Sequence, residues 1–285
     1  MPKKCEEGEV VVIVHSHAEN AEMRSSQRKA AKINKRNQNL KFVFVLFHSE
    51  GSESRVEEEH DLHGDILLGD MEESYHHLIY KHMTGLRWAR DHCPDNMIIK
   101  MDDDIYVNFP SLLGLVPPNI PPSAEGRWMM GLLQVSLPVV RTNSSKWWVS
   151  REDWSQDQYP DFLSGWAYLA SPLALRLVVE VLDHQQNVFW IDDVMVTGVV
   201  APSVGIALTS LNSYFTVYQA ELDCCQARER GVRCGWLVGP TGSSPALLTS
   251  LAGREEECGR ETCRADLLPC PTHHNHQARG EVFQI

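Results

Sequence analysis

The chain has 285 residues, of which 43% are hydrophobic and 8% aromatic, and its formal net charge is −12. This length can bury a sizeable core, as one α/β domain with a smaller appendage. The acidic balance excludes broad nucleic-acid binding, which requires a basic face. No signal peptide precedes the apolar run Val10–Val14, and no run approaches the ~18 apolar residues of a membrane span. If the protein is secretory, we expect its targeting segment to be missing from this chain.

Short apolar runs predict buried strands of a mostly parallel sheet, because both faces of such a sheet are covered. The runs are Val10–Val14, Phe42–Phe47, Ile66–Leu68, Met97–Ile99 and Trp128–Leu133. Helical segments alternate with these runs, which is typical of an α/β sandwich.

Three helices are expected between and after these strands. The segment Glu22–Gln38 is polar and basic, so we expect an exposed helix. Ser171 and Pro172 suit the N-cap and first turn of another helix, Pro172–His184. The proline-rich stretch Pro117–Pro122 predicts a connecting loop. Steps of three and four residues place one helical face on Tyr75, Leu78, Ile79, His82, Leu86 and Ala89.

The carboxyl-terminal part has a different composition, since six of the eight cysteines follow residue 223. Apolar periodicity fades from about Arg228, so we expect residues 228–285 to form a Cys-rich, loop-rich extension with a disordered end. Cysteine spacing without Cys-x-x-Cys favours disulfides of an oxidising compartment, involving Cys258, Cys263 and Cys270. The alternative is a zinc site that draws on His273, His274 and His276.

The strongest local signal is the triplet Asp102-Asp103-Asp104, which follows the run Met97–Ile99. In open α/β sheets, ligands bind at the carboxyl ends of strands. Adjacent carboxylates repel one another and are tolerated best beside a cation, and oxygen ligands suit Mn²⁺ or Mg²⁺. A solvated acidic turn is the alternative. A calcium EF-hand loop is excluded, because Val107 stands where that loop needs glycine.

A second acidic pair, Asp192 and Asp193, lies in the apolar segment Phe189–Val194. One of the two is expected to begin a helix, whose positive end would keep the carboxylate ionised. An ionised carboxylate facing a cleft is a candidate general base. The alternative is a plain N-cap.

Tryptophans are dense just before this pair, at positions 147, 148, 154 and 166. Aromatic faces stack on sugar C–H groups, so a carbohydrate cleft would explain them, and core packing would explain them equally. Asn143-Ser144-Ser145 in the same region is an acceptor sequence for N-glycosylation.

Read in order, these motifs resemble the family of inverting β1,3-galactosyltransferases and β1,3-N-acetylglucosaminyltransferases of the Golgi. Lys100–Asn108 is similar to the family's Lys-x-Asp-Asp-Asp-x-Phe/Tyr-x-Asn signature. Trp147–Tyr168 resembles its aromatic and Ser-Gly-x-Gly-Tyr run, with Ala167 in place of the second glycine, and Asp192–Val194 resembles Glu-Asp-Val. An earlier family pattern is carried by Glu59, Asp65, Ile66, Asp70, Tyr75, Lys81, Trp88 and Cys93.

The resemblance implies a glycosyltransferase A-type α/β fold, with a mostly parallel central sheet flanked by helices. The catalytic domain would span residues 8–227, with a donor half at about 8–115 and an acceptor half at about 123–227. A UDP-sugar would supply galactose or an N-acetylhexosamine, and Mn²⁺ or Mg²⁺ would be the cofactor. The acceptor would be a glycan of a glycoprotein or glycolipid on the lumenal side of the Golgi membrane.

The resemblance also implies a role for each candidate residue. Asp193 would be the general base that deprotonates the acceptor hydroxyl, while Asp104 and Asp102 would bind the metal. The implied donor-binding residues are Asp103, Arg24, Arg28 and Lys81. The implied acceptor-binding residues are Trp148, Gly165, Trp166 and Asp192, and the glycosylated residue would be Asn143.

Three departures from the family pattern leave alternatives open. The early motif lacks its tryptophan at Ala31, Asp192 replaces glutamate, and no late histidine aligns as a metal ligand. One alternative is therefore an inactive, lectin-like member of the same fold. Another is a cytosolic acidic interaction domain, whose cysteines would remain thiols.

Overall fold

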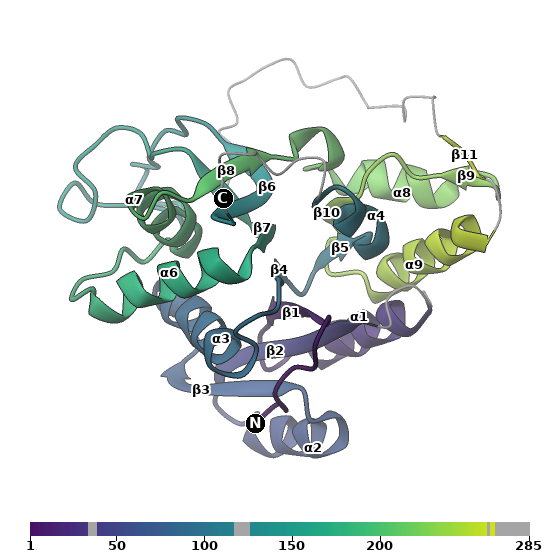
Figure 1. Cartoon of the computed structure of the whole chain (residues 1–285), viewed down its shortest axis with the longest axis horizontal. Helices are drawn as coiled ribbons and strands as arrows, with labels where there is room; N and C mark the ends of the chain where they lie inside the picture. The colour runs from purple at the N-terminus through teal and green to yellow at the C-terminus, as the bar shows by residue number, and fades with distance from the viewer. Residues whose placement is uncertain (34–38, 117–125, 261–262, 266–285) are drawn as a thin grey trace.

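The computed structural model describes residues 1–33, 39–116, 126–260 and 263–265. A seven-stranded sheet runs through it in the order β3-β2-β1-β4-β7-β6-β8 (Figure 1). The strands are β1 (Val10–His15), β2 (Leu40–His48), β3 (Ile66–Glu72), β4 (Ile98–Asp102), β6 (Trp128–Gln134), β7 (Phe162–Ala170) and β8 (Ala207–Ser210). Only β7 runs antiparallel to its described neighbours, β4 and β6.

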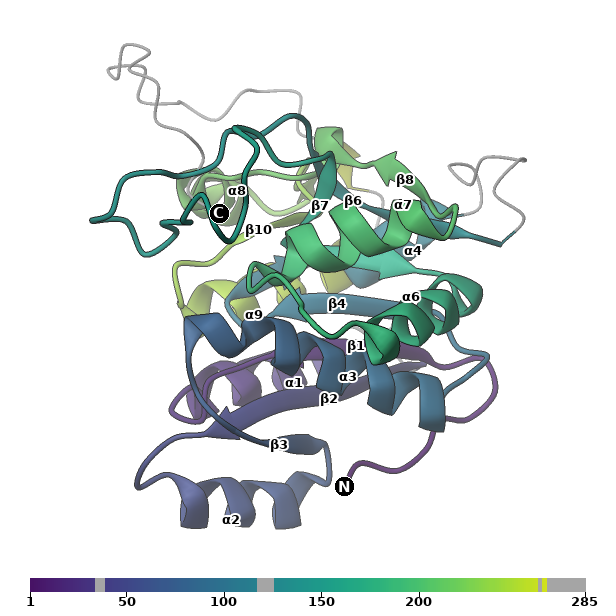
Figure 2. The same ribbon diagram turned by 90° about the vertical axis from the view of Figure 1, so that its left-hand side faces the viewer.

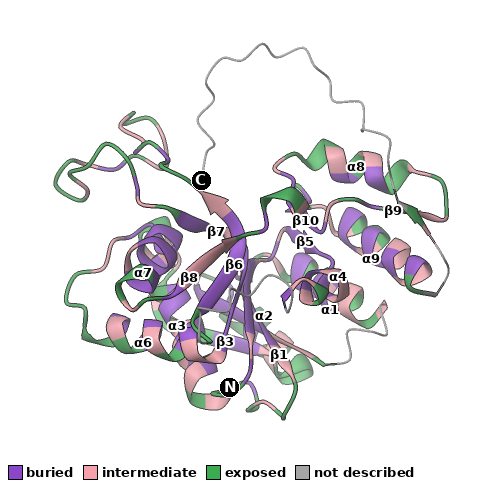
Figure 3. Cartoon of the chain, turned by 45° about the horizontal axis from the view of Figure 1, so that its top comes forward, coloured by how far each residue is buried: buried purple, intermediate pink, exposed green. Residues whose placement is uncertain are grey.

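Successive side chains of each strand point to opposite faces of the sheet, so they pack into a core on either face. In β1, Val11 and Ile13 join one buried cluster, whereas Val12 and Val14 join the other. Helices α3 (Leu78–His92) and α6 (Pro172–His184) cover the first face, and α1 (Ala21–Ile33) and α9 (Pro245–Arg260) lie on the opposite side (Figures 1 and 2). Figure 3 shows the central strands buried between these layers.

The remaining elements are shorter. They are α2 (Glu53–His63), a 3-10 turn (Tyr75–His77), β5 (Ile105–Val107), α4 (Phe109–Gly114), a π-helical segment (Val194–Val200), α7 (Ala201–Ser203), a second 3-10 turn (Asn212–Tyr214), α8 (Gln219–Ala227), β9 (Val232–Arg233), β10 (Val238–Pro240) and β11 (Arg264–Ala265).

The predicted α/β fold, with a mostly parallel sheet flanked by helices, is confirmed, and so are its five predicted strands. The strand expected to end at Ile99 continues as β4 through Asp102, so the acidic triplet begins inside the sheet. Helix α6 has the predicted bounds, and the Ser171 hydroxyl accepts a hydrogen bond from the Ala174 amide at 3.1 Å. Strands β7 and β8 were not predicted.

The expectation that α1 is exposed is wrong. Its Arg24, Gln27 and Arg28 are buried. Arg24 donates two hydrogen bonds to Glu59, at 2.9 and 2.6 Å, and Arg28 contacts Glu59 at 2.7 Å and Asp65 at 2.7 and 2.8 Å. Polar residues can be buried when each donor finds an acceptor, and these acceptors come from distant parts of the chain.

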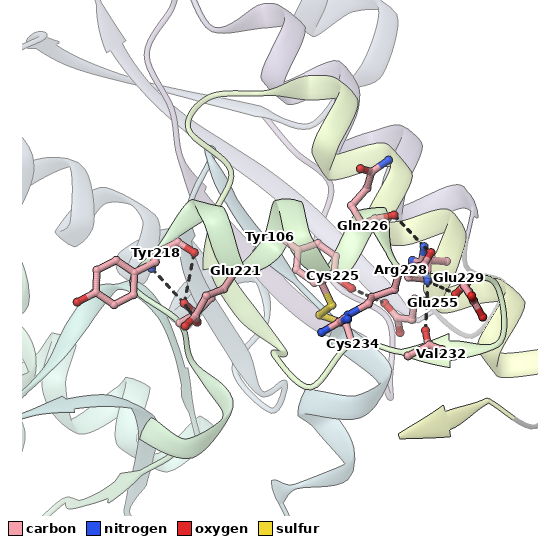
Figure 4. Close-up of a disulfide and its surroundings, with 12 residues drawn as sticks. Tyr106, Tyr218, Glu221, Cys225, Gln226, Arg228, Glu229, Val232, Cys234 and Glu255 are labelled. Carbon is pink, nitrogen blue, oxygen red and sulfur yellow. Dashed lines mark hydrogen bonds between the residues drawn. A yellow bond between two sulfur atoms is a disulfide. The ribbon is translucent and has the colours of Figure 1, made fainter. Parts of the chain in front are cut away.

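The expectation of a loop-rich carboxyl-terminal extension is also wrong for residues 245–260, which form α9. Leu247 and Leu251 of α9 pack in one buried cluster with Tyr106 and Leu222. Figure 4 shows this region, with the disulfide Cys225–Cys234 beside Tyr106. The division of the chain at residue 227 stays a prediction.

Two further disulfides among the described residues join Cys5 to Cys93 and Cys258 to Cys263, so the prediction that Cys258 and Cys263 are in disulfides is confirmed. Several predictions fall on segments outside the described residues. These concern the end of the first helix after Ile33, the loop Pro117–Pro122, Cys270, the three late histidines and the disordered end.

We expect Glu59→Gln to lower the free energy of unfolding by about 3 kcal/mol, because it leaves the buried Arg24 without its charged partner. Burial alone would raise the pKa of Glu59, but hydrogen bonds from Arg24 and Arg28 lower it. The contribution of the carboxylate is therefore present at neutral pH and lost as pH falls through that lowered pKa. Urea unfolding measured across pH should show that the free energies of unfolding of Glu59→Gln and the wild type become equal in acid.

The exposed neighbour Glu58→Gln is the matched control and should unfold like the wild type. Equal stability of Glu59→Gln and wild type at neutral pH would contradict the role of this ion-pair cluster.

Candidate functional site

A cavity of about 610 Å³ gathers acidic residues from distant parts of the chain. The triplet Asp102 to Asp104 lies at the carboxyl end of β4. Asp192 and Asp193 reach the same cavity from the segment that precedes the π-helical turn. The two acidic motifs singled out in the sequence therefore line one site, at the edge of the sheet where ligands of α/β proteins bind.

Within the triplet, the three carboxylates have different partners. Asp102 accepts a hydrogen bond from Lys100 Nζ at 2.9 Å. Asp103 is buried and accepts from the Ser16 hydroxyl at 2.5 Å and from Asn20 Nδ2 at 3.0 Å. Among the described residues, no other side chain donates a hydrogen bond to the Asp104 carboxylate. Asp104 is thus the member of the triplet most available to a ligand, and the hydrogen bond of Asp102 to Lys100 uses Oδ1.

The charge around Asp104 suits a cation. Burial and the neighbouring Asp103 raise the pKa of the Asp104 carboxyl, so the ionised form needs a compensating positive charge. No group of three His, Cys, Asp or Glu side chains is arranged to hold a metal by itself in the part of the chain that the structure describes. A hard cation at the triplet would therefore need its other ligands from a bound molecule or water.

The main chain of Asp104 is fixed by the carboxyl-terminal part of the protein. The amide and hydroxyl of Thr241 donate to the Asp104 carbonyl at 2.9 and 2.7 Å. Strand β10, just before Thr241, pairs antiparallel with β5, which places Pro240 opposite Ile105. The segment after residue 227 is therefore in direct contact with the acidic turn.

A single residue, Gly165, connects the triplet to the second acidic pair. Lys100 Nζ donates to the Gly165 carbonyl at 2.6 Å, and the Gly165 amide donates to Asp193 Oδ2 at 3.1 Å. A Cβ atom at position 165 would lie 3.1 Å from Lys100 Nζ, a tight contact that favours glycine. Gly165, predicted to contact the acceptor, thus also joins the two acidic motifs.

Asp193 caps the π-helical segment Val194–Val200, and its Oδ1 accepts from the Val194 amide at 2.8 Å. The predicted helix start is confirmed, and the Val194 amide at that start favours the ionised carboxylate. Burial and the charge of Asp192 raise the pKa of Asp193. Burial would also raise the pKa of Asp192, but a hydrogen bond from His82 and the charge of Lys100 lower it. A proton shared by this pair therefore resides on Asp193.

His82 supports Asp192 from the protein core, and the sequence analysis placed it only on a helical face. It is fully buried, with Nδ1 2.8 Å from Asp192 Oδ2 and Nε2 2.6 Å from the Tyr168 hydroxyl. Burial lowers the pKa of His82, so we assign the neutral ring, with Nδ1–H donating to Asp192 and Nε2 accepting from Tyr168. The available signal was a histidine on an otherwise apolar face, since a buried imidazole requires partners.

The sequence matches the family model described as galactosyltransferase over residues 23–212. The chain belongs to the galactosyltransferase family. This range includes both acidic motifs and His82, and it ends before Thr241.

Relatives carry related names. The chain is 28% identical over 227 residues to beta-1,3-galactosyltransferase 5 of Pan paniscus, covering 78% of this chain and 74% of that protein. It is 28% identical over 217 residues to the Rattus norvegicus lactosylceramide 1,3-N-acetyl-beta-D-glucosaminyltransferase, covering 72% of this chain and 57% of that protein. A solved structure of the galactosyltransferase LgtC, in complex with donor and acceptor sugar analogs, covers 85% of this chain and 95% of its own, with 12% identity and a TM-score of 0.41.

Of the residues expected to bind the donor, two line the cavity and two lie outside its lining. Asp103 and Lys81 line the cavity, although Lys81 Nζ is bound to both Glu73 oxygens at 2.6 Å. Arg24 and Arg28 lie outside the lining. Arg24 contacts the Ser16 hydroxyl at 3.0 Å and therefore supports the residue that holds Asp103.

Of the residues expected to bind the acceptor, Gly165, Trp166 and Asp192 line the cavity. Trp148 does not, and its side chain is exposed on the surface. The neighbouring Trp147 lines the cavity instead and lies parallel to Trp190, with ring centroids 6.5 Å apart. The acceptor-binding role of Trp148 stays a prediction, although its ring lies outside the cavity lining and that of Trp147 belongs to it.

Asn143, the expected glycosylation site, lies in an exposed turn. Among the described residues, no helix has the length and apolar character needed to cross a bilayer.

We expect His82→Leu to lower the free energy of unfolding by about 3 kcal/mol, because the buried Asp192 carboxylate loses its hydrogen-bonded partner. Urea unfolding of His82→Leu, Asp192→Asn and the double variant measures this pair directly. The double variant should be less destabilised than the sum of the two single variants.

The exposed His184→Leu serves as the control and should leave stability unchanged. Additive effects of the two single variants would show that His82 and Asp192 do not interact energetically.

Proposed function

We propose that this protein is a metal-dependent, inverting glycosyltransferase. It transfers galactose or an N-acetylhexosamine from a UDP-sugar to a glycan hydroxyl and forms a β1,3 linkage. The observation that carries the proposal is that Asp104, assigned to the cation, and Asp193, assigned as the base, line one cavity, in which Lys100 and Gly165 connect Asp102 to Asp193. The names of the relatives, β1,3-galactosyl- and 1,3-N-acetylglucosaminyltransferases, support this substrate class.

On the donor side, we assign Asp104 and Asp102 to the cation, with Mn²⁺ or Mg²⁺ as the ion. A bound divalent cation would neutralise the negative charge that develops on the leaving diphosphate. Asp103 keeps the turn in place through Ser16 and Asn20.

On the acceptor side, the Asp193 carboxylate takes the proton of the acceptor hydroxyl. Amide donors from Gly165 and Val194 fix one oxygen each, so the carboxylate has a defined orientation. Its raised pKa makes it a stronger base than an ordinary aspartate. The hydroxyl oxygen forms a bond to the anomeric carbon as the bond to the diphosphate oxygen breaks, and attack from the opposite face inverts the configuration.

The disulfides of the described residues support an oxidising compartment and argue against the cytosolic interaction domain. We propose the lumen of the Golgi as the location and a glycoprotein or glycolipid glycan as the acceptor. A second candidate, an inactive lectin-like protein, is favoured by the missing third metal ligand among the described residues. Release of UDP from a UDP-sugar distinguishes the two.

We expect Asp104→Ala to abolish Mn²⁺-dependent binding of UDP, because it removes an anionic ligand from a site that must also hold a diphosphate. Calorimetry of UDP with and without Mn²⁺ is the measurement. Asp95→Ala, at a side chain that is 92% exposed, is the matched control. Unchanged Mn²⁺-dependent affinity in Asp104→Ala would remove this residue from the metal site.

We expect Asp193→Asn to reduce the transfer rate at least ~10²-fold while UDP affinity is retained, since asparagine cannot accept the proton. Because the pKa of Asp193 is raised, the wild-type rate should increase with pH through a value above the usual range of carboxyl groups. The rate and the affinity are measured on the same preparation. A retained transfer rate would mean that Asp193 serves only as a helix cap.

A further inference from the structure

The cavity lining carries more negative than positive charge. It includes three lysines, Lys81, Lys100 and Lys146, and six carboxylates, Glu73, Asp102, Asp103, Asp104, Asp192 and Asp193, which give a formal charge of −3. An anionic ligand that enters this cavity needs positive charge from the protein as well as from a cation.

Two of the three lysines are already bound to carboxylates. Lys81 Nζ lies 2.6 Å from Glu73, and Lys100 Nζ lies 2.9 Å from Asp102. Lys146 forms no ion pair with any carboxylate of the described residues, and its charge is free to meet a ligand.

Lys146 is held at the cavity by aromatic residues instead. Its Nζ donates to the Tyr75 hydroxyl at 3.1 Å and lies 5.0 Å from the centroid of that ring. It also lies 4.9 Å from the centroid of the Trp147 ring, and the two rings meet edge to face at 5.4 Å. Tyr75 precedes α3, whereas Lys146 and Trp147 belong to the segment between β6 and β7, so the contact joins two sides of the cavity. Cation–π contacts at exposed positions are weak, so an anion can compete for the ammonium.

Lys146 shares the cavity with the residue assigned to the cation, because Lys146 and Asp104 both belong to its lining. A diphosphate bound at Asp104 through a cation would therefore occupy the same cavity as the ammonium of Lys146.

We propose that Lys146 is a donor-binding residue that leaves the Tyr75 hydroxyl to bind the diphosphate of the nucleotide-sugar. This inference rests on the proposed function and adds to it a residue outside both acidic motifs. A lysine ammonium binds phosphate as a point charge and needs no fixed geometry, which suits a side chain that changes partners. The same charge stabilises the UDP that leaves when the sugar is transferred.

The test compares UDP with uridine, which shares the nucleoside and lacks the phosphates. Calorimetry in the presence of Mn²⁺ should show that Lys146→Met weakens UDP binding by at least ~10-fold, the loss expected for one charged hydrogen bond. Uridine affinity should be the same in the variant and the wild type. Lys146→Arg should recover most of the UDP affinity. Lys29→Met, at an exposed position of α1, is the control with the same change in net charge.

Tyr75→Phe provides a second, independent variant. It removes the hydroxyl that accepts from Lys146 and keeps the ring, so UDP should bind at least as tightly as in the wild type. If Tyr75→Phe lost as much UDP affinity as Lys146→Met, this would contradict the proposal that Lys146 leaves the Tyr75 hydroxyl to bind the diphosphate.

Equal UDP affinity in Lys146→Met and wild type would overturn the proposal, and so would an equal loss of UDP and uridine binding. The second result would mean that Lys146 shapes the nucleoside pocket or the acceptor side. A wild-type protein that binds neither UDP nor UDP-sugars with Mn²⁺ would contradict the proposed function itself, which separates the two failures.

Discussion

The buried ammonium of Lys100 is the interaction on which the geometry of the site depends. Its Nζ binds Asp102 on its own strand and the Gly165 carbonyl on the neighbouring β7, and the Gly165 amide in turn binds Asp193. Burial would lower the pKa of Lys100, but Asp102, Asp192 and Asp193 raise it, so the side chain stays charged. The ammonium and the carboxylates stabilise one another, which allows an acidic cavity to form inside a folded protein. The carboxylates of the two acidic motifs are thereby fixed relative to each other.

The parts of the fold that were predictable are those in which local pattern and burial agree. Short apolar runs became buried strands, and Ser171 with Pro172 defined the start of α6. Where partners are distant in sequence, local pattern failed. Helix α1 has the composition of an exposed helix. Its arginines are nevertheless buried, because they form ion pairs with Glu59 and Asp65. In α9, the helical spacing of buried leucines was obscured by surrounding glycine, cysteine and charged residues.

In the site, too, the features with a local sequence pattern were predicted and those that depend on distant residues were not. The acidic triplet and Asp193 were found because adjacent carboxylates in apolar surroundings require a chemical reason, and the cavity contains them all. The choice between Trp147 and Trp148 depends on the path of an irregular segment, which composition does not determine. His82 was visible only as a polar member of a helical face, because its partners Asp192 and Tyr168 lie far along the chain. Its role became apparent from contacts across the core.

The measurement that tests the central claim most directly is the anomeric configuration of the product. The protein is incubated with Mn²⁺, an α-linked UDP-sugar and a glycan acceptor, and the new linkage is analysed by NMR. Direct displacement assisted by Asp193 predicts a β-linked sugar at the 3-position of the acceptor. An α-linked product would contradict the single displacement, and the absence of any product with every UDP-sugar and acceptor tried would favour the inactive, lectin-like protein.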